Sequence, residues 1–138
     1  MRLILDSCVA LKTALPETDS AIAAQLMNDY HSGIHELLAP DVFFVEVGHS
    51  LTRAERQNRI LPGSTWGLWK TIMADCPQLI DSLPLMKRAI EISSSVRIGL
   101  YDCLYVALAE QEGCNLVTSD EKLIKNLSGF PIISLSSF

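Results

Sequence analysis

Four acidic residues, far apart in the sequence, interrupt or end strongly apolar stretches. They are Asp6, Glu46, Asp102 and Asp120. An ionised carboxylate is costly to bury unless it is paired or coordinates a metal. The segments 42–47 and 100–107 are otherwise largely apolar, so the acid in each of them needs a partner. We therefore expect these carboxylates to carry the function, and the four to share one partner.

Four carboxylates in one pocket would repel one another strongly. At a spacing of roughly 5 Å and an effective dielectric constant of about 20, each like-charged pair is unfavourable by about 3 kcal/mol. Six such pairs approach about 20 kcal/mol, which exceeds the net stability of a typical domain. Either raised pKa values keep some of the acids protonated, or a hard divalent cation lies among them. The second arrangement suits hydrolysis of a phosphodiester.

The elements that must position these acids alternate between strand and helix patterns, which predicts an α/β fold. We expect three layers, α/β/α, with helices on both faces of a mostly parallel central sheet. In such a fold, sites lie beyond the carboxyl ends of the strands. The predicted strands are 2–5, 36–39, 77–81, 114–118 and 132–133, and the predicted helices are 18–31, 42–58, 64–75, 85–94, 100–112 and 121–127.

The positions of the four acids relative to these elements predict that they converge. Asp6 and Asp120 each follow a strand by a residue or two, so the topology directs both to the same edge. Glu46 lies one to two turns into a helix that follows a strand, and Asp102 lies near the start of its helix. Both helices can therefore bring their acids to that edge.

Length and composition predict one domain in a reducing compartment. The 138 residues are 49% hydrophobic and 20% charged, which supports a single core and no disordered tail. No apolar stretch is long enough to cross a bilayer, so we expect a soluble protein without a membrane partner. The four cysteines form no C-x-x-C pair, which indicates buried thiols and a cytoplasmic protein. The net charge of −5 argues against nonspecific coating of nucleic acid but allows a local basic rim.

Around the four acids the chain resembles the PIN-domain family, and most closely the compact ribonuclease toxins of the VapC type. The segment 3–9 is similar to that family's opening strand with its first acid, and 40–51 to the block that carries its glutamate. The segment 101–110 is the most specific match, and 116–123 resembles the closing block. The four blocks occur in the family's order, which implies one PIN domain over residues 1–138.

The resemblance also implies an activity. Asp6, Asp102 and Asp120 would hold Mg²⁺ or Mn²⁺, directly or through water, and Glu46 would complete the acidic cluster. The implied function is an endoribonuclease that uses a metal-activated water and leaves 5′-phosphate and 3′-hydroxyl ends. The implied partners are the RNA substrate, the cognate antitoxin of a type II toxin–antitoxin pair, and a second copy of the chain in a homodimer.

Each candidate residue has a simpler alternative role. Asp6 and Asp120 both stand where a helix N-cap is expected. Ser7 and Thr118 are candidates to hydrogen-bond the acids or a metal-bound water, and backbone-bonded hydroxyls are the alternative. Arg97 is a candidate contact for a substrate phosphate, against a role as a plain surface arginine.

Two further groups lie outside these blocks. Arg53, Arg56 and Arg59 end the helix that carries Glu46, and they either guide RNA or an acidic partner or form a solvated helix end. Trp66 and Trp69 suggest an oligomer interface or a partner groove, but packing in the core is the interpretation that we prefer.

Two other functions compete with the nuclease. The first is a non-catalytic PIN-fold module that binds RNA or protein, and the retention of all four acids argues against it. The second is a metal-dependent phosphatase of another α/β fold. The segment 6–8, Asp-Ser-Cys, lacks the second aspartate of a D-x-D nucleophile motif, which argues against that phosphatase.

Overall fold

The computed structural model describes all of residues 1–138, and its five strands form one sheet in the order β3-β2-β1-β4-β5. Every neighbouring pair is parallel, so the sheet is fully rather than mostly parallel. The three predicted layers and the α/β class are confirmed. The strands are β1 (Arg2–Leu5), β2 (Glu36–Pro40), β3 (Gln78–Ile80), β4 (Asn115–Thr118) and β5 (Ile132–Ser134).

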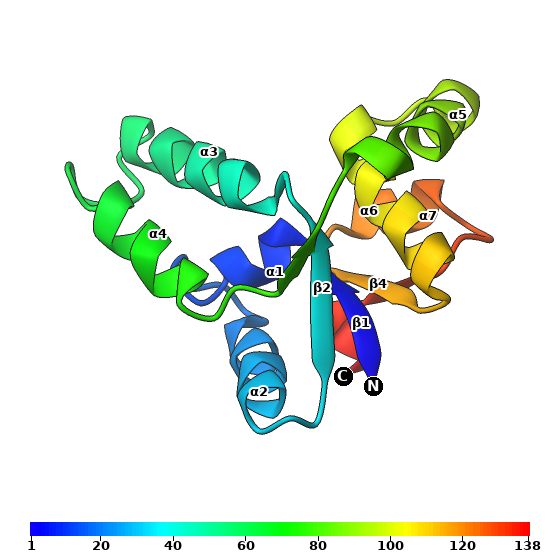
Figure 1. The fold of residues 1–138 in the computed structure, drawn as a ribbon. Helices are drawn as coiled ribbons and strands as arrows, with labels where there is room; N and C mark the ends of the chain where they lie inside the picture. Colours follow the sequence, from blue (N-terminus) through cyan, green and yellow to red (C-terminus); the bar gives the residue numbers. More distant parts are fainter.

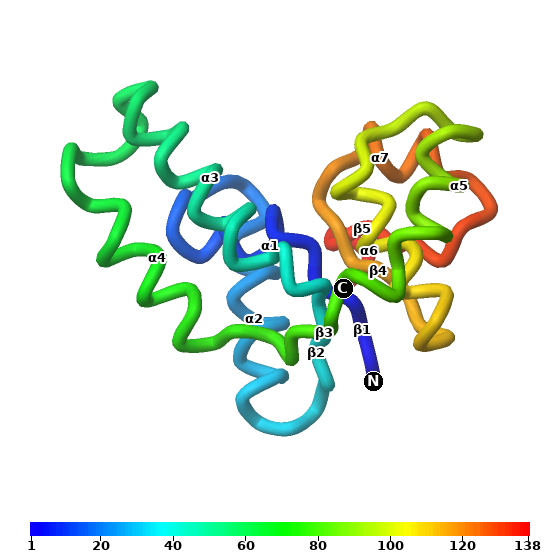
Figure 2. Tube along the Cα trace, turned by 45° about the horizontal axis from the view of Figure 1, so that its top comes forward, coloured from blue at the N-terminus to red at the C-terminus, as the bar shows by residue number.

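The helices form two layers, with α1 to α4 on one face of the sheet and α5 to α7 on the other (Figures 1 and 2). None of them has the length and apolar composition of a membrane-crossing segment. The helices are α1 (Ser7–Leu11), α2 (Ser20–His31), α3 (Phe43–Arg56), α4 (Thr65–Met73), α5 (Met86–Val96), α6 (Leu100–Glu112) and α7 (Glu121–Asn126), with two 3₁₀ turns, η1 (Leu83–Leu85) and η2 (Leu135–Ser137).

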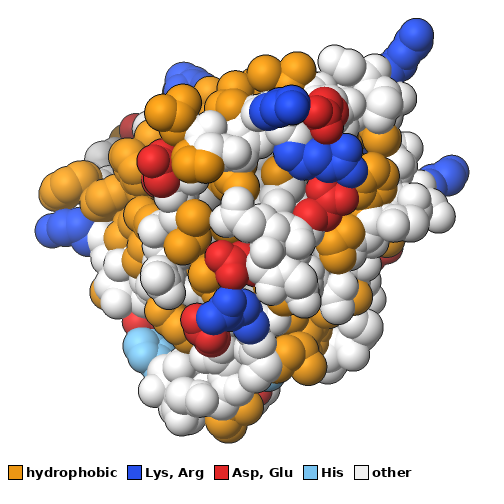
Figure 3. All heavy atoms as spheres, turned by 45° about the vertical axis from the view of Figure 1, so that its right-hand side comes forward, with side chains coloured by type: hydrophobic (Ala, Val, Ile, Leu, Met, Phe, Trp, Pro, Cys, Tyr) orange, Lys and Arg blue, Asp and Glu red, His pale blue; other side chains and the backbone are white.

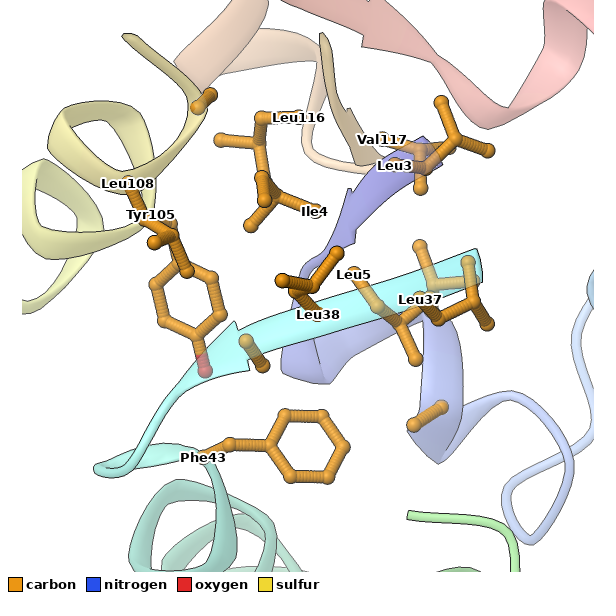
Figure 4. Packing of buried hydrophobic residues seen from close by; sticks show 14 of the residues in the cluster. Leu3, Ile4, Leu5, Leu37, Leu38, Phe43, Tyr105, Leu108, Leu116 and Val117 are labelled. Atoms are coloured by element: carbon orange, nitrogen blue, oxygen red, sulfur yellow. The ribbon is translucent and has the colours of Figure 1, made fainter. Parts of the chain in front are cut away.

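The core covers both faces of the sheet around β1, and α6 contributes most of it on one face. Leu3, Ile4 and Leu5 of β1 have no exposed surface, as expected for a central strand covered on both faces. All seven residues from Cys103 to Ala109 are buried, because α6 lies across the middle of the sheet. Figure 4 shows how the side chains of these elements meet. The continuous apolar character of α6 in the sequence therefore reflects its central position.

The strand order reverses between β1 and β4. The chain runs from β1 outward to β2 and β3, and then returns to place β4 on the other side of β1, with Leu5 paired with Val117. In open parallel sheets a crevice forms beyond the carboxyl ends of the strands at such a reversal. Asp6 follows β1 and Asp120 follows β4, so both acids lie at this crevice.

Two predictions about the first layer need correction. The helix predicted over 42–58 ends at Arg56. Trp66, for which core packing was preferred, is 65% exposed and stacks on Trp69 with ring centroids 5.3 Å apart. It is exposed because α4 packs on α3, and the α3–α4 pair extends away from the sheet (Figure 1).

Candidate active site

Asp6 is held at the end of β1 by hydrogen bonds to β4. Its backbone N–H donates to the Val117 carbonyl at 3.1 Å, and its Oδ2 accepts from the Thr118 hydroxyl at 2.6 Å. Asp6 stands at the N-cap position of α1, as its place in the sequence suggests, but its side chain makes no capping hydrogen bond there. Burial raises the pKa of Asp6, and the negative charge of Asp120 adds to this rise. An acid whose ionised form is disfavoured in this way is suited to a cation.

Thr118 links two of the acids through one hydroxyl group. This hydroxyl donates to Asp6, accepts the backbone N–H of Asp120 at 3.1 Å, and lies 3.4 Å from Cys8 Sγ. Because its single proton goes to Asp6, the thiol must be the donor in the contact with Cys8. For Thr118, the predicted hydrogen bond to an acid is confirmed.

Asp120 caps α7, as its position in the sequence suggests. Its Oδ1 accepts the backbone N–H of Leu123 at 3.1 Å. This bond uses one carboxylate oxygen, while Oδ2 makes no hydrogen bond. The cap therefore fixes the side chain and leaves an oxygen free for a second role.

The two acids on helices lie in the first turns of α3 and α6 and have raised pKa values. Glu46 Oε1 is buried without a hydrogen-bond partner. Burial raises the pKa of Glu46 to about 7, and the charges of Asp6 and Asp102 contribute. Burial likewise raises the pKa of Asp102 to about 6, with contributions from Asp6 and Asp120. Burial and the neighbouring charges thus disfavour the ionised forms of both carboxyl groups.

The four acids thus come within electrostatic range of one another at one edge of the sheet. Each of Asp6, Glu46 and Asp102 has a pKa raised in part by at least one of the others or by Asp120. No three potential ligands, however, lie close enough together to form a ready-made metal centre.

The donor set nevertheless fits a small hard cation. Mg²⁺ prefers oxygen ligands, keeps several of its waters, and binds through one or two carboxylates together with substrate phosphates. Glu46 Oε1 and Asp120 Oδ2 are carboxylate oxygens without hydrogen-bond partners. Direct contacts from Asp6, Asp102 or Asp120, with water-mediated contacts from the rest, would satisfy such an ion without a closed cage.

Sequence analysis did not single out Tyr105, which borders the site. Its hydroxyl is buried without a partner and lies by the carboxyl end of β2 (Figure 4). Burial raises the pKa of Tyr105, and the charges of Glu46 and Asp6 add to the rise. The available signal was its position three residues after Asp102, on the same face of α6. A hydroxyl inside such an apolar run needs a polar partner, just as the acid does.

Arg97 and Ser7 occupy different positions relative to the acids. Arg97 ends α5 in a left-handed conformation with φ of 61°. With Asp102 and Asp120 it lines a pocket of about 270 Å³, so the structure brings this guanidinium group to the acidic edge. Ser7 is buried at the start of α1, but Thr118, not Ser7, donates the hydrogen bond to Asp6.

Comparison with known proteins agrees with this fold. The sequence pattern of the PIN domain matches residues 3–128, and the chain belongs to the PIN domain family. It is 35% identical over 88 residues to Ribonuclease VapC1 of Mycobacterium tuberculosis (strain CDC 1551 / Oshkosh), and the alignment covers 62% of this chain and 63% of that protein. The chain thus spans less than two thirds of the length of this curated relative.

Solved structures share the whole fold at low sequence identity. PAE2754 from Pyrobaculum aerophilum matches with a TM-score of 0.71 and 19% identity, over 99% of this chain and 94% of that one. DNA-bound VapBC from Salmonella typhimurium matches with a TM-score of 0.72 and 13% identity, over 98% of each chain. These structures confirm the fold, and the match to the family over residues 3–128 confirms the predicted resemblance to the PIN domain family.

Proposed function

We propose that the chain, as a single PIN domain over residues 1–138, is a divalent-metal-dependent endoribonuclease and the toxin of a type II toxin–antitoxin pair. The observation that carries this proposal is the convergence of four carboxylates at the strand-order reversal, where burial and the charges of neighbouring acids raise the pKa values of Asp6, Glu46 and Asp102. The 35% identity to a protein named Ribonuclease VapC1 supports RNA as the substrate.

In this proposal Asp6, Asp102 and Asp120 hold Mg²⁺ or Mn²⁺, and Glu46 completes the cluster. The bound cation supplies a Lewis acid for the phosphate oxygens and a water of lowered pKa. Thr118 keeps Asp6 in one orientation through its 2.6 Å hydrogen bond. The residues of β1 and β4 thus form the rigid part of the site.

The reaction is attack of water on phosphorus with cleavage of the bond between phosphorus and O3′. The water oxygen stays on phosphorus, and a proton passes to the departing O3′, so the products carry a 5′-phosphate and a 3′-hydroxyl. Glu46 is suited to accept the proton of the attacking water because burial raises its pKa to about 7, close to neutral pH. Arg97 is placed to contact a substrate phosphate from the pocket that it shares with Asp102 and Asp120.

The comparisons also support an antitoxin partner. Similar folds include VapBC2 from Rickettsia felis bound to a promoter DNA fragment and a toxin–antitoxin complex from Klebsiella pneumoniae. We propose that a cognate antitoxin holds this chain inactive with a segment that covers the acidic pocket, and that the chain forms a homodimer.

Cleavage of RNA by purified variants tests the proposal. Wild-type protein with Mg²⁺ or Mn²⁺ should cut RNA, and excess EDTA should stop it. Asp6→Asn and Asp102→Asn should each lose cleavage while their circular dichroism stays native. Glu91→Gln is the matched control, because Glu91 is an exposed acid that pairs with Arg88 away from the site. Retained cleavage in the two aspartate variants would refute the site, and a wild type that binds RNA without cutting it would favour the non-catalytic module.

A further inference from the structure

A second pocket lies beside the acids, on the side opposite Arg97. It has a volume of about 440 Å³ and lies between α1, the end of α3, and the turn from β4 to α7. Its wall includes three cationic side chains, one carboxylate, an amide and several small polar side chains. The charged residues are Lys12, Arg53, Arg59 and Glu17, the amide is Gln57, and Cys8 and Ser119 are the small residues nearest the acids.

The wall of this pocket is in direct contact with the acidic site. The Ser119 hydroxyl donates to Cys8 Sγ at 3.2 Å, and this sulfur lies 3.4 Å from the Thr118 hydroxyl. The same hydroxyl donates to Asp6 at 2.6 Å. A ligand in the pocket therefore lies next to the position where a scissile phosphodiester must bind if the proposed function is correct.

Two of the three cations in the pocket are unpaired. Lys12 is only 7% exposed, and its Nζ pairs with Glu17 at 2.5 Å and with Asp19 at 2.7 Å. Arg53 and Arg59 form no ion pair within the chain.

The opposite arrangement occurs on the α5–α6 side of the molecule, where basic side chains lie beside acidic ones (Figure 3). There, Arg88 pairs with Glu110 at 2.7 Å and Arg2 pairs with Glu112 at 2.8 Å. Two unpaired guanidinium groups lining one pocket, in a chain of net charge −5, therefore mark it as a site for an anion.

The end of α3 explains how both arginines reach the pocket. Asn58 adopts a left-handed conformation with φ of 58°. Its N–H bonds to the Glu55 carbonyl at 3.1 Å, and the Arg59 N–H bonds to the Ala54 carbonyl at 2.9 Å. This is the double hydrogen bond of a Schellman motif, which ends the helix and reverses the chain. Arg59 is thereby returned to the pocket that Arg53 lines from within the helix.

We propose that this pocket binds one nucleotide of the RNA, adjacent to the scissile phosphodiester. Arg53 and Arg59 bind its phosphate, because a planar guanidinium matches phosphate oxygens with paired hydrogen bonds. The Gln57 amide offers both a donor and an acceptor to the base or the ribose. The volume of about 440 Å³ is in the usual range for small-ligand pockets. The proposal rests on the proposed function, because it places the nucleotide by reference to the cleaved bond.

Arg56 provides a matched control for the test. It lies on the same helix end, is exposed like Arg53 and Arg59, and carries the same charge, but it does not line the pocket. Binding is measured by fluorescence anisotropy with a short 5′-labelled oligoribonucleotide in EDTA buffer. The protein carries Asp102→Asn so that no cleavage occurs.

Arg53→Ala and Arg59→Ala should each weaken binding by roughly tenfold or more, since hydrogen bonds to charged groups are lost. The double variant should also reduce the slope of log affinity against log salt by about 0.7, the value for one phosphate contact with a single strand. Arg56→Ala should change neither quantity. In cleavage assays without the Asp102 substitution, the pocket variants should raise KM with kcat nearly unchanged.

The outcomes separate this inference from the proposed function. If Arg53→Ala and Arg59→Ala behave like Arg56→Ala while wild-type protein cleaves RNA, the pocket assignment is wrong and the nuclease stands. If wild-type protein does not cleave RNA but binding depends on Arg53 and Arg59, the nuclease is wrong and the pocket remains an RNA site. Equal displacement of the RNA by an oligoglutamate peptide of the same charge would contradict RNA as the occupant.

Discussion

The acids at the strand ends and the acids on the helices are held by different means. Asp6 accepts a hydrogen bond from Thr118, and Asp120 accepts one from the backbone of α7. Glu46 Oε1, in contrast, is buried without a partner, and the Asp102 side chain makes no hydrogen bond. Both pairs lie at one edge of the sheet, but only the first pair is fixed by the fold itself.

This difference indicates which half of the site needs a ligand. A buried polar atom without a hydrogen bond is unfavourable, and a buried charge without a partner is more so. Burial raises the pKa values of both helix acids, so their ionised forms lower the stability of the folded chain. Active sites commonly combine such unfavourable groups with a rigid support, because the groups that are needed for activity often lower the stability of the fold.

The largest effect is expected for Thr118→Val, which changes the part of the site that holds the acids at the strand ends. This substitution keeps the shape of the side chain but removes the hydroxyl that joins Asp6 to the Asp120 backbone. Loss of buried hydrogen bonds should lower the free energy of unfolding by about 1–3 kcal/mol. Urea denaturation measures this change, and cleavage should fall because Asp6 is no longer oriented. Thr118→Ser, which keeps the hydroxyl, should retain most of the activity, and equal activity in both variants would contradict the role given to Thr118.

A smaller effect is the pH dependence of stability that the two helix acids cause. In the folded chain the pKa of Glu46 is about 7 and that of Asp102 about 6, above their ordinary values of 4.5 and 3.8. The folded state then binds more protons than the unfolded state at intermediate pH. This contribution to stability is fully present below the ordinary values and is lost as the pH rises through about 6 and then about 7.

Chemical denaturation in metal-free buffer at pH 5 and pH 8 checks this sign. The contribution of Glu46 and Asp102 should make the free energy of unfolding of the wild-type protein lower at pH 8 than at pH 5. Glu46→Gln should reduce the difference, because the amide does not titrate. A pH dependence that is unchanged in Glu46→Gln would show that Glu46 titrates normally.

The smallest effect distinguishes the role of Asp120 as a helix cap from its role in cleavage. Asparagine is about as good an N-cap as aspartate, so Asp120→Asn should change stability by only a few tenths of a kcal/mol, whereas Asp120→Ala should cost about 1 kcal/mol. Both variants should lose cleavage, because both lack the negative charge. If Asp120→Asn cleaves RNA like wild type, Asp120 serves only as a helix cap.

The sequence predicts the placement of the strand acids better than the surroundings of the helix acids. Asp6 and Asp120 follow parallel strands, and parallel strand ends meet at one edge whatever the side chains around them. The Tyr105 hydroxyl near Glu46 depends on how α6 and α3 are rotated against the sheet. Hydrophobic periodicity gives the face of one helix and not the angle between two helices.

The sequence pattern also does not predict the surface features. The helix predicted to continue to residue 58 ends at Arg56, because Asn58 takes a left-handed conformation that periodicity does not signal. That one turn brings Arg59 into the pocket with Arg53. Trp66 and Trp69 look equivalent in the sequence, but only α4's packing on α3 decides that Trp66 is the exposed one.

A thermal melt with Mn²⁺ tests most directly whether the converging acids bind a cation. At a free Mn²⁺ concentration of about 100 times Kd, a site present only in the folded state adds about 2.7 kcal/mol of stability. We predict that Mn²⁺ raises the Tm of the wild type and of Glu91→Gln, and that Asp102→Asn loses most of this rise. No rise in the wild type, or an equal rise in Asp102→Asn, would contradict the metal site.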